Sequence, residues 1–196
     1  MRLIIFTRYP TAGRVKTRLI PSLGERGAML LYRRLVEYTL DQSRKFEGST
    51  EIRFTGGNLK QMKSWLGEQF YYREQKGMSL GERLTGAVAE AFSEEFKKVV
   101  VIGTDCPGLK IDHINEAFRL LDGSELVIGP AVDGGYYLIG FSNCYPELFH
   151  DISWGSSEVY RQTIKAANRL NLKIAVLEKL ADIDRPADLA SWLNLS

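Results

Sequence analysis

Short runs of β-branched and aliphatic residues alternate along the chain with longer stretches whose apolar residues recur at helical spacing. Helical spacing is clearest between Glu25 and Lys45. The expected strands are Leu3–Phe6, Glu51–Phe54, Lys98–Ile102, Glu125–Ile128, Tyr137–Phe141 and Lys173–Leu177. Such alternation, with strands that are apolar throughout, is typical of a mostly parallel sheet with helices on both faces. The sequence therefore predicts an α/β fold with a doubly wound sheet.

Capping residues indicate where the later helices begin. Ser79 and Glu82 form an S-x-x-E capping box ahead of an apolar stripe, so a helix is expected to start at Ser79. Asp112 is the expected cap of the next helix, and Pro186 is a favourable first helical residue. The remaining expected helices are Asp112–Leu121, Ser156 or Ser157 to about Leu170, and Pro186 to about Leu193.

Composition limits the class of protein. The 196 residues are 44% hydrophobic, without repeat or linker, so we expect residues 1–196 to form a single domain. A balance of 26 basic and 24 acidic residues argues against a nucleic-acid partner. Cys106 and Cys144 lack metal or disulfide spacing, which favours a cytoplasmic protein. The MRLIIFT start is too short for a signal peptide or a membrane span, and the sequence does not indicate an oligomeric state.

A basic loop, YPTAGRVKTRL, follows the first expected strand, at the sheet edge where doubly wound folds bind ligands. Gly13 permits a positive φ or a close approach to a ligand, and it lies next to Arg8, Arg14, Lys16 and Arg18. The basic side chains suit phosphate oxygens, so a diphosphate is the expected guest. Neither the P-loop nor the dinucleotide-binding glycine pattern is present. The alternative interpretation is a solvated basic turn.

Asp105 directly follows the apolar strand in VVVIGTDCPGL, so its carboxylate is expected to face the ligand crevice. Hard cations such as Mg²⁺ or Mn²⁺ take oxygen ligands and often keep only one or two from the protein. Asp105 is therefore the first candidate metal ligand. The alternative is that Asp105 caps a turn through its own backbone.

Asp133 precedes two glycines in GPAVDGGYYLIGF, beside the same crevice. Gly134 and Gly135 are expected to form, with Tyr136 and Tyr137, a flexible aromatic loop able to close over a sugar or base. Asp133 could then bind an acceptor hydroxyl or act as a base. The alternative is a hairpin, because D-G between apolar runs is a strong turn signal.

Asp182 and Asp184 lie two residues apart in LADIDRPADL, on one side of an extended stretch. Either carboxylate could complete a metal site, and the alternative is that Asp184 caps the helix ahead of Pro186. Trp154, between a loop and a helix, either packs in the core or stacks on a ligand ring. Cys106 is a weak candidate nucleophile, because no sequence feature ties a histidine to its thiol.

Six segments together resemble one family, the bacterial glycosyltransferase-like proteins associated with arsenosugar biosynthesis. They are PTAGRVKTRL (Pro10–Leu19), SLGERL (Ser79–Leu84), GTDCPGL (Gly103–Leu109), DGGYYLIG (Asp133–Gly140), WGSSEV (Trp154–Val159) and DIDRPADL (Asp182–Leu189). That family is similar to the molybdopterin and phospholactate guanylyltransferases. The resemblance implies a GT-A type nucleotide-diphospho-sugar transferase fold.

The resemblance also implies roles for single residues. It makes the Gly13–Arg18 loop the clamp on the nucleotide phosphates, with Lys16 as the phosphate-binding lysine. It makes Asp105 the metal-binding acid at the strand end and Asp184 the second metal ligand. The glycosyltransferase D-x-D motif is absent at Asp105, where the sequence reads T-D-C.

The leading hypothesis is a Mg²⁺- or Mn²⁺-dependent transferase that uses a nucleotide-sugar or a nucleoside triphosphate and a small acceptor. Lys16 and Arg14 would neutralise charge on the phosphate leaving group, and Asp133 would take the acceptor proton. The sequence does not choose between glycosyl and nucleotidyl transfer, although the resemblance favours glycosyl transfer. A non-catalytic nucleotide-binding regulatory protein is the hypothesis from another class.

Overall fold

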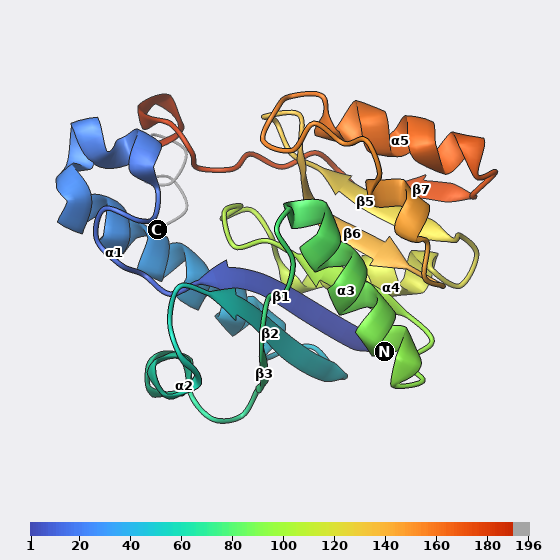
Figure 1. The fold of residues 1–196 in the computed structure, drawn as a ribbon, viewed down its shortest axis with the longest axis horizontal. Coiled ribbons are helices and arrows are strands. Elements are labelled where there is room, and N and C mark those ends of the chain that lie inside the picture. The colour runs from blue at the N-terminus through green and yellow to red at the C-terminus, as the bar shows by residue number, and fades with distance from the viewer. Residues whose placement is uncertain (190–196) are drawn as a thin grey trace.

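The structure of the chain, a computed structural model, describes residues 1–189 (Figure 1). Its strands are β1 (Arg2–Arg8), β2 (Ser49–Thr55), β3 (Tyr71–Glu74), β4 (Val99–Ile102), β5 (Leu126–Pro130), β6 (Tyr136–Phe141) and β7 (Ile174–Val176). Its α-helices are α1 (Ile20–Ser43), α2 (Leu59–Leu66), α3 (Leu80–Ser93), α4 (Ile111–Leu120) and α5 (Val159–Arg169). Three short 3₁₀ helices are η1 (Thr17–Leu19), η2 (Pro146–Phe149) and η3 (Pro186–Asp188).

These strands join one sheet in the order β3-β2-β1-β4-β6-β5-β7. Every neighbouring pair is parallel except the two that β6 makes with β4 and β5. The predicted mostly parallel sheet is therefore confirmed. Because β1, β4 and β5 point the same way, their carboxyl ends and the start of β6 lie at one edge. The loop between β5 and β6 connects two antiparallel strands, which confirms the hairpin interpretation of the Asp133 segment.

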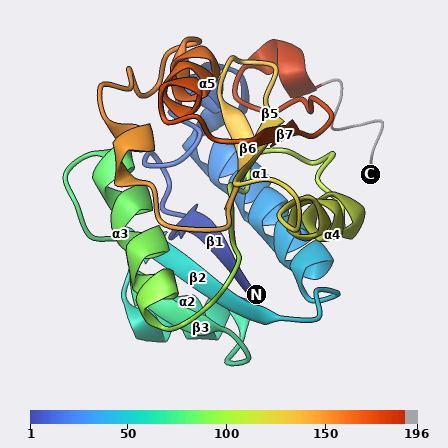
Figure 2. The same ribbon diagram turned by 90° about the vertical axis from the view of Figure 1, so that its right-hand side faces the viewer.

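Helices cover both faces of the sheet, as predicted (Figure 2). On one face, Leu3 and Ile5 of β1 pack in a cluster that includes Val36 of α1 and residues of α2 and α4. On the other face, Ile4 packs with Val88 of α3 and residues of α5. A strand that buries both faces must be apolar at every position, which explains why the central strands read as continuous apolar runs.

Two of the expected helix starts are confirmed. Ser79 is the N-cap of α3, and its side chain accepts a hydrogen bond from the Glu82 N–H. In α1, Gly24 leaves the helical conformation at φ 68°, so the regular part begins where the sequence places it. Within residues 1–189 no helix is long and apolar enough to cross a membrane.

Other helix boundaries differ from the prediction. The N-cap of α4 is Lys110, whose N–H donates to the His113 ring, so Asp112 lies in the first turn and is not the cap. The α5 helix begins at Val159, since Ser156 belongs to the preceding turn and donates to the Ser153 carbonyl. At the last expected helix the structure has the 3₁₀ helix η3, and its expected end at Leu193 lies outside the described residues.

The α2 helix and the β3 strand were not expected from the sequence. The α2 helix buries only Met62 and Leu66 and is capped by Asn58, while β3 is a four-residue strand with no fully buried residue. Neither element has the apolar run that marks the central strands.

Candidate active site at the carboxyl edge

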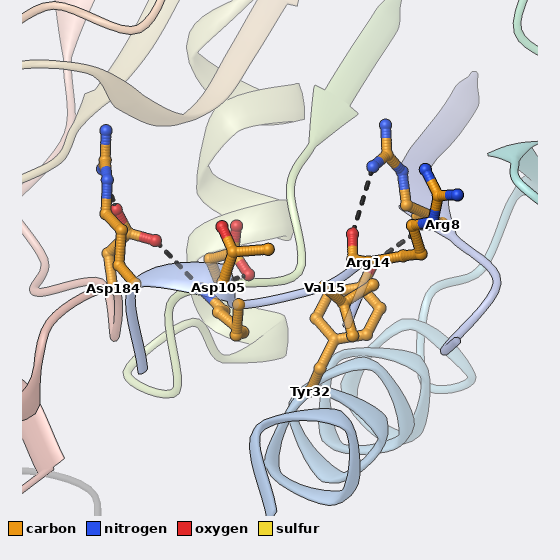
Figure 3. A pocket seen from close by; sticks show the side chains of 9 residues that line it. Arg8, Arg14, Val15, Tyr32, Asp105 and Asp184 are labelled. Carbon is orange, nitrogen blue, oxygen red and sulfur yellow. Dashed lines mark hydrogen bonds and ion pairs between the residues drawn. The ribbon is translucent and has the colours of Figure 1, made fainter. Parts of the chain in front are cut away.

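Loops at the carboxyl edge of the sheet enclose a cavity of about 380 Å³, here called the basic cavity (Figure 3). It is lined by Arg8, Arg14, Val15, Lys16, Thr17, Arg18, Tyr32, Asp105 and Asp184. In Figure 3, Asp105 and Asp184 lie on one side of Val15, and Arg8 and Arg14 lie on the other. The structure thus brings five of the predicted site residues, three basic and two acidic, into one place.

Lys16 is the most enclosed charged group of the basic cavity, with only 4% of its side chain exposed. Its Nζ donates to the Ile183 carbonyl at 2.5 Å and lies 2.7 Å from Asp105 Oδ1. The same nitrogen is 3.8 Å from Asp184 Oδ1. One ammonium therefore links three loops that are distant in the sequence.

The backbone fixes where this ammonium lies. Lys16 adopts the left-handed conformation (φ 47°, ψ 43°), which costs a non-glycine residue about 1–2 kcal/mol. Its carbonyl accepts from the Leu19 N–H at 2.9 Å, at the start of η1. Ile183 is fully buried among α1 residues, and its N–H donates to the Asp105 carbonyl at 3.0 Å. Lys16 and both acids are thus held without any ligand.

Arg18 and Arg8 complete the charge pattern of the basic cavity. Arg18 pairs with Asp184 Oδ2 while 60% of its side chain stays exposed, and Arg8 donates to the Arg14 carbonyl at 3.2 Å. An exposed ion pair adds little to stability. Folding therefore gives little reason for this concentration of exposed cations.

Tyr32 is a cavity residue that the sequence analysis missed. Its hydroxyl oxygen accepts from the Arg8 N–H at 2.8 Å and is hydrogen-bonded to Thr7 Oγ1 at 3.0 Å. Burial raises the pKa of Tyr32, with the nearby Asp105 carboxylate as a second cause. In sequence Tyr32 is only one more apolar position of a helical stripe, so no local signal indicated it.

Two acidic cavities adjoin the basic one. A cavity of about 330 Å³ shares Arg18 and Asp184 with it and is also lined by Asp133, Asp182 and Arg185. A smaller cavity of about 130 Å³ contains Asp105, Asp133 and Asp182 together with Cys106 and Gly135. The predicted acids therefore line three neighbouring cavities that share residues, and Asp133 lines both acidic ones.

Asp182 and Asp184 both face these cavities, while Ile183 between them is buried, as an extended stretch requires. Burial raises the pKa of the Asp182 carboxyl, and the Asp133 and Asp184 carboxylates raise it further. Asp184, in contrast, has Arg18 and Lys16 beside it. Both side chains face the cavities, so orientation does not distinguish the two acids. The neighbouring cations do, because Asp184 pairs with Arg18 and Lys16.

Replacing Asp182 with asparagine is expected to raise the melting temperature near pH 7.5. Because the folded-state pKa is raised, folding favours the protonated carboxyl, and this advantage is lost as pH rises through the folded-state pKa. Asparagine imitates the uncharged form at every pH. The gain over the native protein should therefore shrink as pH falls toward 4, as followed by thermal unfolding at both pH values. Asp112→Asn, on the first turn of α4, is the control, and a gain independent of pH would contradict the explanation.

The glycines of the Asp133 loop have separate structural reasons. Gly134 has φ 91°, and a Cβ there would lie 2.2 Å from the Ser157 carbonyl oxygen, so only glycine fits. The Gly135 N–H donates to Asp133 Oδ1 at 2.7 Å, which orients the Asp133 carboxylate. Gly13 has φ 74°, which confirms that the basic loop needs a positive φ.

Tyr136 and Trp154 contact each other edge to face, with ring centroids 6.5 Å apart. Tyr136 lines the smaller acidic cavity. Trp154 packs in the apolar cluster under α3, 6.2 Å from the Phe149 ring, and is not among the residues that line the three cavities. Trp154 is thus partly buried against the apolar cluster, and its stacking on a ligand ring stays a prediction.

Cys106 is one of the residues that line the smaller acidic cavity, and it is buried. Burial raises the pKa of its thiol, and the neighbouring Asp182 and Asp105 carboxylates raise it further. A thiol kept protonated in this way is a poor nucleophile. The structure thus argues against Cys106 as the reactive group.

Within residues 1–189, no group of three or more histidine, cysteine or acidic side chains is arranged to hold a metal ion. The basic cavity does offer two carboxylates, Asp105 and Asp184, both within 4 Å of the Lys16 ammonium. Mg²⁺ is usually bound by one or two carboxylates and completed by substrate phosphates and water. The two carboxylates therefore fit a hard cation whose other ligands come from phosphates and water.

Comparisons with known proteins agree with the fold. Residues 39–156 match the family described as "Uncharacterized protein conserved in bacteria (DUF2064)". The chain is similar to the crystal structure of a candidate nucleotide-diphospho-sugar transferase from Desulfovibrio desulfuricans G20. The two are 35% identical with a TM-score of 0.89, over 94% of this chain and 82% of that one.

A curated protein and a further solved structure are also similar to the chain. The 2-phospho-L-lactate guanylyltransferase of Methanocaldococcus jannaschii is 28% identical over 127 residues. That match covers 61% of this chain and 55% of the relative, so it spans only about half of the relative's length. A 4-diphosphocytidyl-2C-methyl-D-erythritol synthase from Anaerococcus prevotii shares the fold, with 10% identity and a TM-score of 0.64 over 99% of this chain and 96% of that one.

Proposed function

The chain belongs to the DUF2064 family, and from this premise we propose that it is a metal-dependent transferase with a nucleotide-sugar or nucleoside triphosphate donor. The observation that carries the proposal is the basic cavity, where Arg14, Lys16 and Arg18 gather beside Asp105 at the carboxyl edge. Doubly wound folds bind their ligands at this edge. The similarity to the Desulfovibrio structure, which carries the name of a nucleotide-diphospho-sugar transferase, supports this assignment.

The basic side chains act on the donor's phosphates. Arg14 and Arg18 supply charge-assisted hydrogen bonds to phosphate oxygens, and Lys16 supplies a compact positive charge. In glycosyl and nucleotidyl transfer alike, negative charge grows on the departing phosphate. Fixed cations that meet this charge lower the barrier, because they need no reorganisation during the reaction.

Asp105 and Asp184 are the residues that would hold Mg²⁺ or Mn²⁺, as hard oxygen donors of the same cavity. When bound, such a cation would neutralise phosphate charge as a Lewis acid. The chain's own contribution is to hold both carboxylates at the donor's phosphates, through the buried Ile183 and the loop after β4.

Asp133 is the proposed base toward the acceptor. Its carboxylate is oriented by the Gly135 N–H and faces both acidic cavities, which adjoin the donor's cavity through Asp184 and Asp105. A small acceptor bound there, with Gly134, Gly135 and Tyr136 around it, would present its hydroxyl to Asp133.

Glycosyl transfer to a small acceptor is the first candidate reaction, in keeping with the resemblance to the glycosyltransferase-like proteins. Nucleotidyl transfer is the second, and the match to the guanylyltransferase of M. jannaschii favours it. The first reaction releases a nucleoside diphosphate from a sugar-nucleotide, and the second releases pyrophosphate from a triphosphate. Product analysis by ion-exchange chromatography therefore separates them.

A thermal-shift screen of nucleoside di- and triphosphates and sugar-nucleotides, with and without Mn²⁺, tests the proposal. A donor at one hundred times its Kd should stabilise the folded state by about 2.7 kcal/mol, and so raise the melting temperature of a chain this size by roughly 5–10 °C. The shift should be largest with Mn²⁺ present. If no nucleotide changes the melting temperature, the basic cavity is not a donor site, and binding without product from any donor would indicate a regulatory protein.

A further inference from the structure

We propose that Lys16 is the resident cation of the basic cavity, and that it keeps divalent cations away from Asp105 and Asp184 until nucleotide phosphates bind. The inference rests on the proposed function for the identity of the phosphate ligand. It concerns the order of binding, which the donor and acceptor assignments leave open.

The position of the Lys16 ammonium carries the inference. Nζ lies close to both acids, 2.7 Å from Asp105 Oδ1 and 3.8 Å from Asp184 Oδ1, and donates to the Ile183 carbonyl. A metal ion shared by Asp105 and Asp184 would have to enter the same space. The lysine thus fills the place of the metal, with its side chain 4% exposed.

Binding a second cation beside the Lys16 ammonium is electrostatically unfavourable. A Mg²⁺ ion bound to Asp105 Oδ1 at about 2.1 Å would lie no further than roughly 4.8 Å from the ammonium, which is 2.7 Å from the same oxygen. Like charges at such a separation repel each other, so a second cation beside Lys16 is unfavourable. Arg18 adds to this, because it already pairs with the other oxygen of Asp184.

The negative charges of Asp105 and Asp184 are therefore neutralised by residues of the chain itself. Lys16 and Arg18 supply two positive charges against the two negative charges of Asp105 and Asp184. A divalent cation alone would leave the cluster with an excess of positive charge. A di- or triphosphate removes that excess, and the flexible lysine stem lets the ammonium turn from the carboxylates to the phosphate oxygens.

The consequence is positive coupling between the two ligands. Each should bind more tightly in the presence of the other, by the same factor in both directions. Lys16 would act as a counter-ion to the carboxylates in the free protein and as a counter-ion to the phosphates in the complex.

Titration of Mn²⁺ into the protein without nucleotide, followed by the loss of the free Mn²⁺ resonance signal, tests the inference. Lys16→Met should bind Mn²⁺ at least about tenfold more tightly than the native protein. Lys98→Met is the matched control, because Lys98 also bonds a carbonyl (Phe118, 3.0 Å) and an aspartate (Asp122, 2.6 Å), away from this cavity. It should bind Mn²⁺ as weakly as the native protein.

Two further variants of Lys16 serve as controls. Lys16→Arg keeps the positive charge and should stay native-like, and Lys16→Gln, which can still bond the Ile183 carbonyl, should repeat the gain if the methionine variant does not fold. Adding Asp105→Asn to Lys16→Met should abolish the gain. Equal Mn²⁺ affinity of the native and Lys16→Met proteins, or a gain that survives Asp105→Asn, overturns the inference. If the proposed function itself is wrong, nucleotides leave the melting temperature of the native protein unchanged, whatever the Mn²⁺ titrations show. The two failures can therefore be told apart.

Discussion

Replacing Asp105 with asparagine is expected to lower turnover by about 10²–10³-fold, the usual cost of removing one group that stabilises transition-state charge. Asparagine keeps the size of the side chain and removes its charge. The variant would lose the carboxylate best placed to hold a divalent cation and the nearest partner of the Lys16 ammonium. Initial rates with the donor found by the thermal-shift screen measure the effect, together with the nucleotide Kd with and without Mn²⁺.

The pattern of losses is as informative as their size. Asp105→Asn should remove the contribution of Mn²⁺ to nucleotide affinity, while affinity measured without metal changes little, because Arg14 and Arg18 remain. Asp122→Asn is the matched control, since Asp122 also pairs with a lysine, Lys98, but lies away from the cavity. It should keep native rates. If Asp105→Asn retained the full Mn²⁺ effect on nucleotide binding, Asp105 would have no part in a metal site.

The central part of the fold could be predicted because its strands are buried on both faces. A strand such as β4, with four fully enclosed residues, has to be an unbroken apolar run, and that run is visible without any structure. The β3 strand lies at the sheet edge with Tyr71 largely exposed, so burial imposes no pattern on it. The α2 helix did have a local signal in the Asn58–Gln61 capping box, which the sequence analysis did not use.

The sequence predicts mainly those site residues that follow directly after a strand. Asp105 follows β4 and the basic loop follows β1, so parallel neighbours bring them to one edge. The carbonyl of Ile183 and the hydroxyl of Tyr32 reach the same place through long-range packing of α1, which no local pattern encodes. The predicted cap at Asp112 failed for a local reason, because the helix begins at Ile111 and the N–H of its N-cap, Lys110, donates to the His113 ring.

Away from the site, an ionic network crosses the face of the sheet under α3. Glu51 of β2 is fully buried and pairs with Arg53 on its own strand and with Arg2 of β1, whose side chains are also almost fully enclosed. Glu90 and Glu94, on α3 and at its C-terminal end, give Arg53 and Arg2 further partners at 2.7 and 2.6 Å. The sequence analysis did not identify this network, because charged residues in a strand are usually expected to face solvent.

Glu51→Ala is expected to destabilise the protein by about 3 kcal/mol, because it leaves two buried guanidinium groups without their shared carboxylate. Removing one partner of a buried ion pair usually costs about 3–5 kcal/mol. The loss here is expected at the lower end, because Glu90 and Glu94 still pair with these arginines. Urea unfolding followed by circular dichroism measures the loss. Glu94→Ala is the matched control, with the partner carboxylate 32% exposed, and should cost no more than about 1 kcal/mol. Equal losses for the two variants would show that burial does not set the strength of this network.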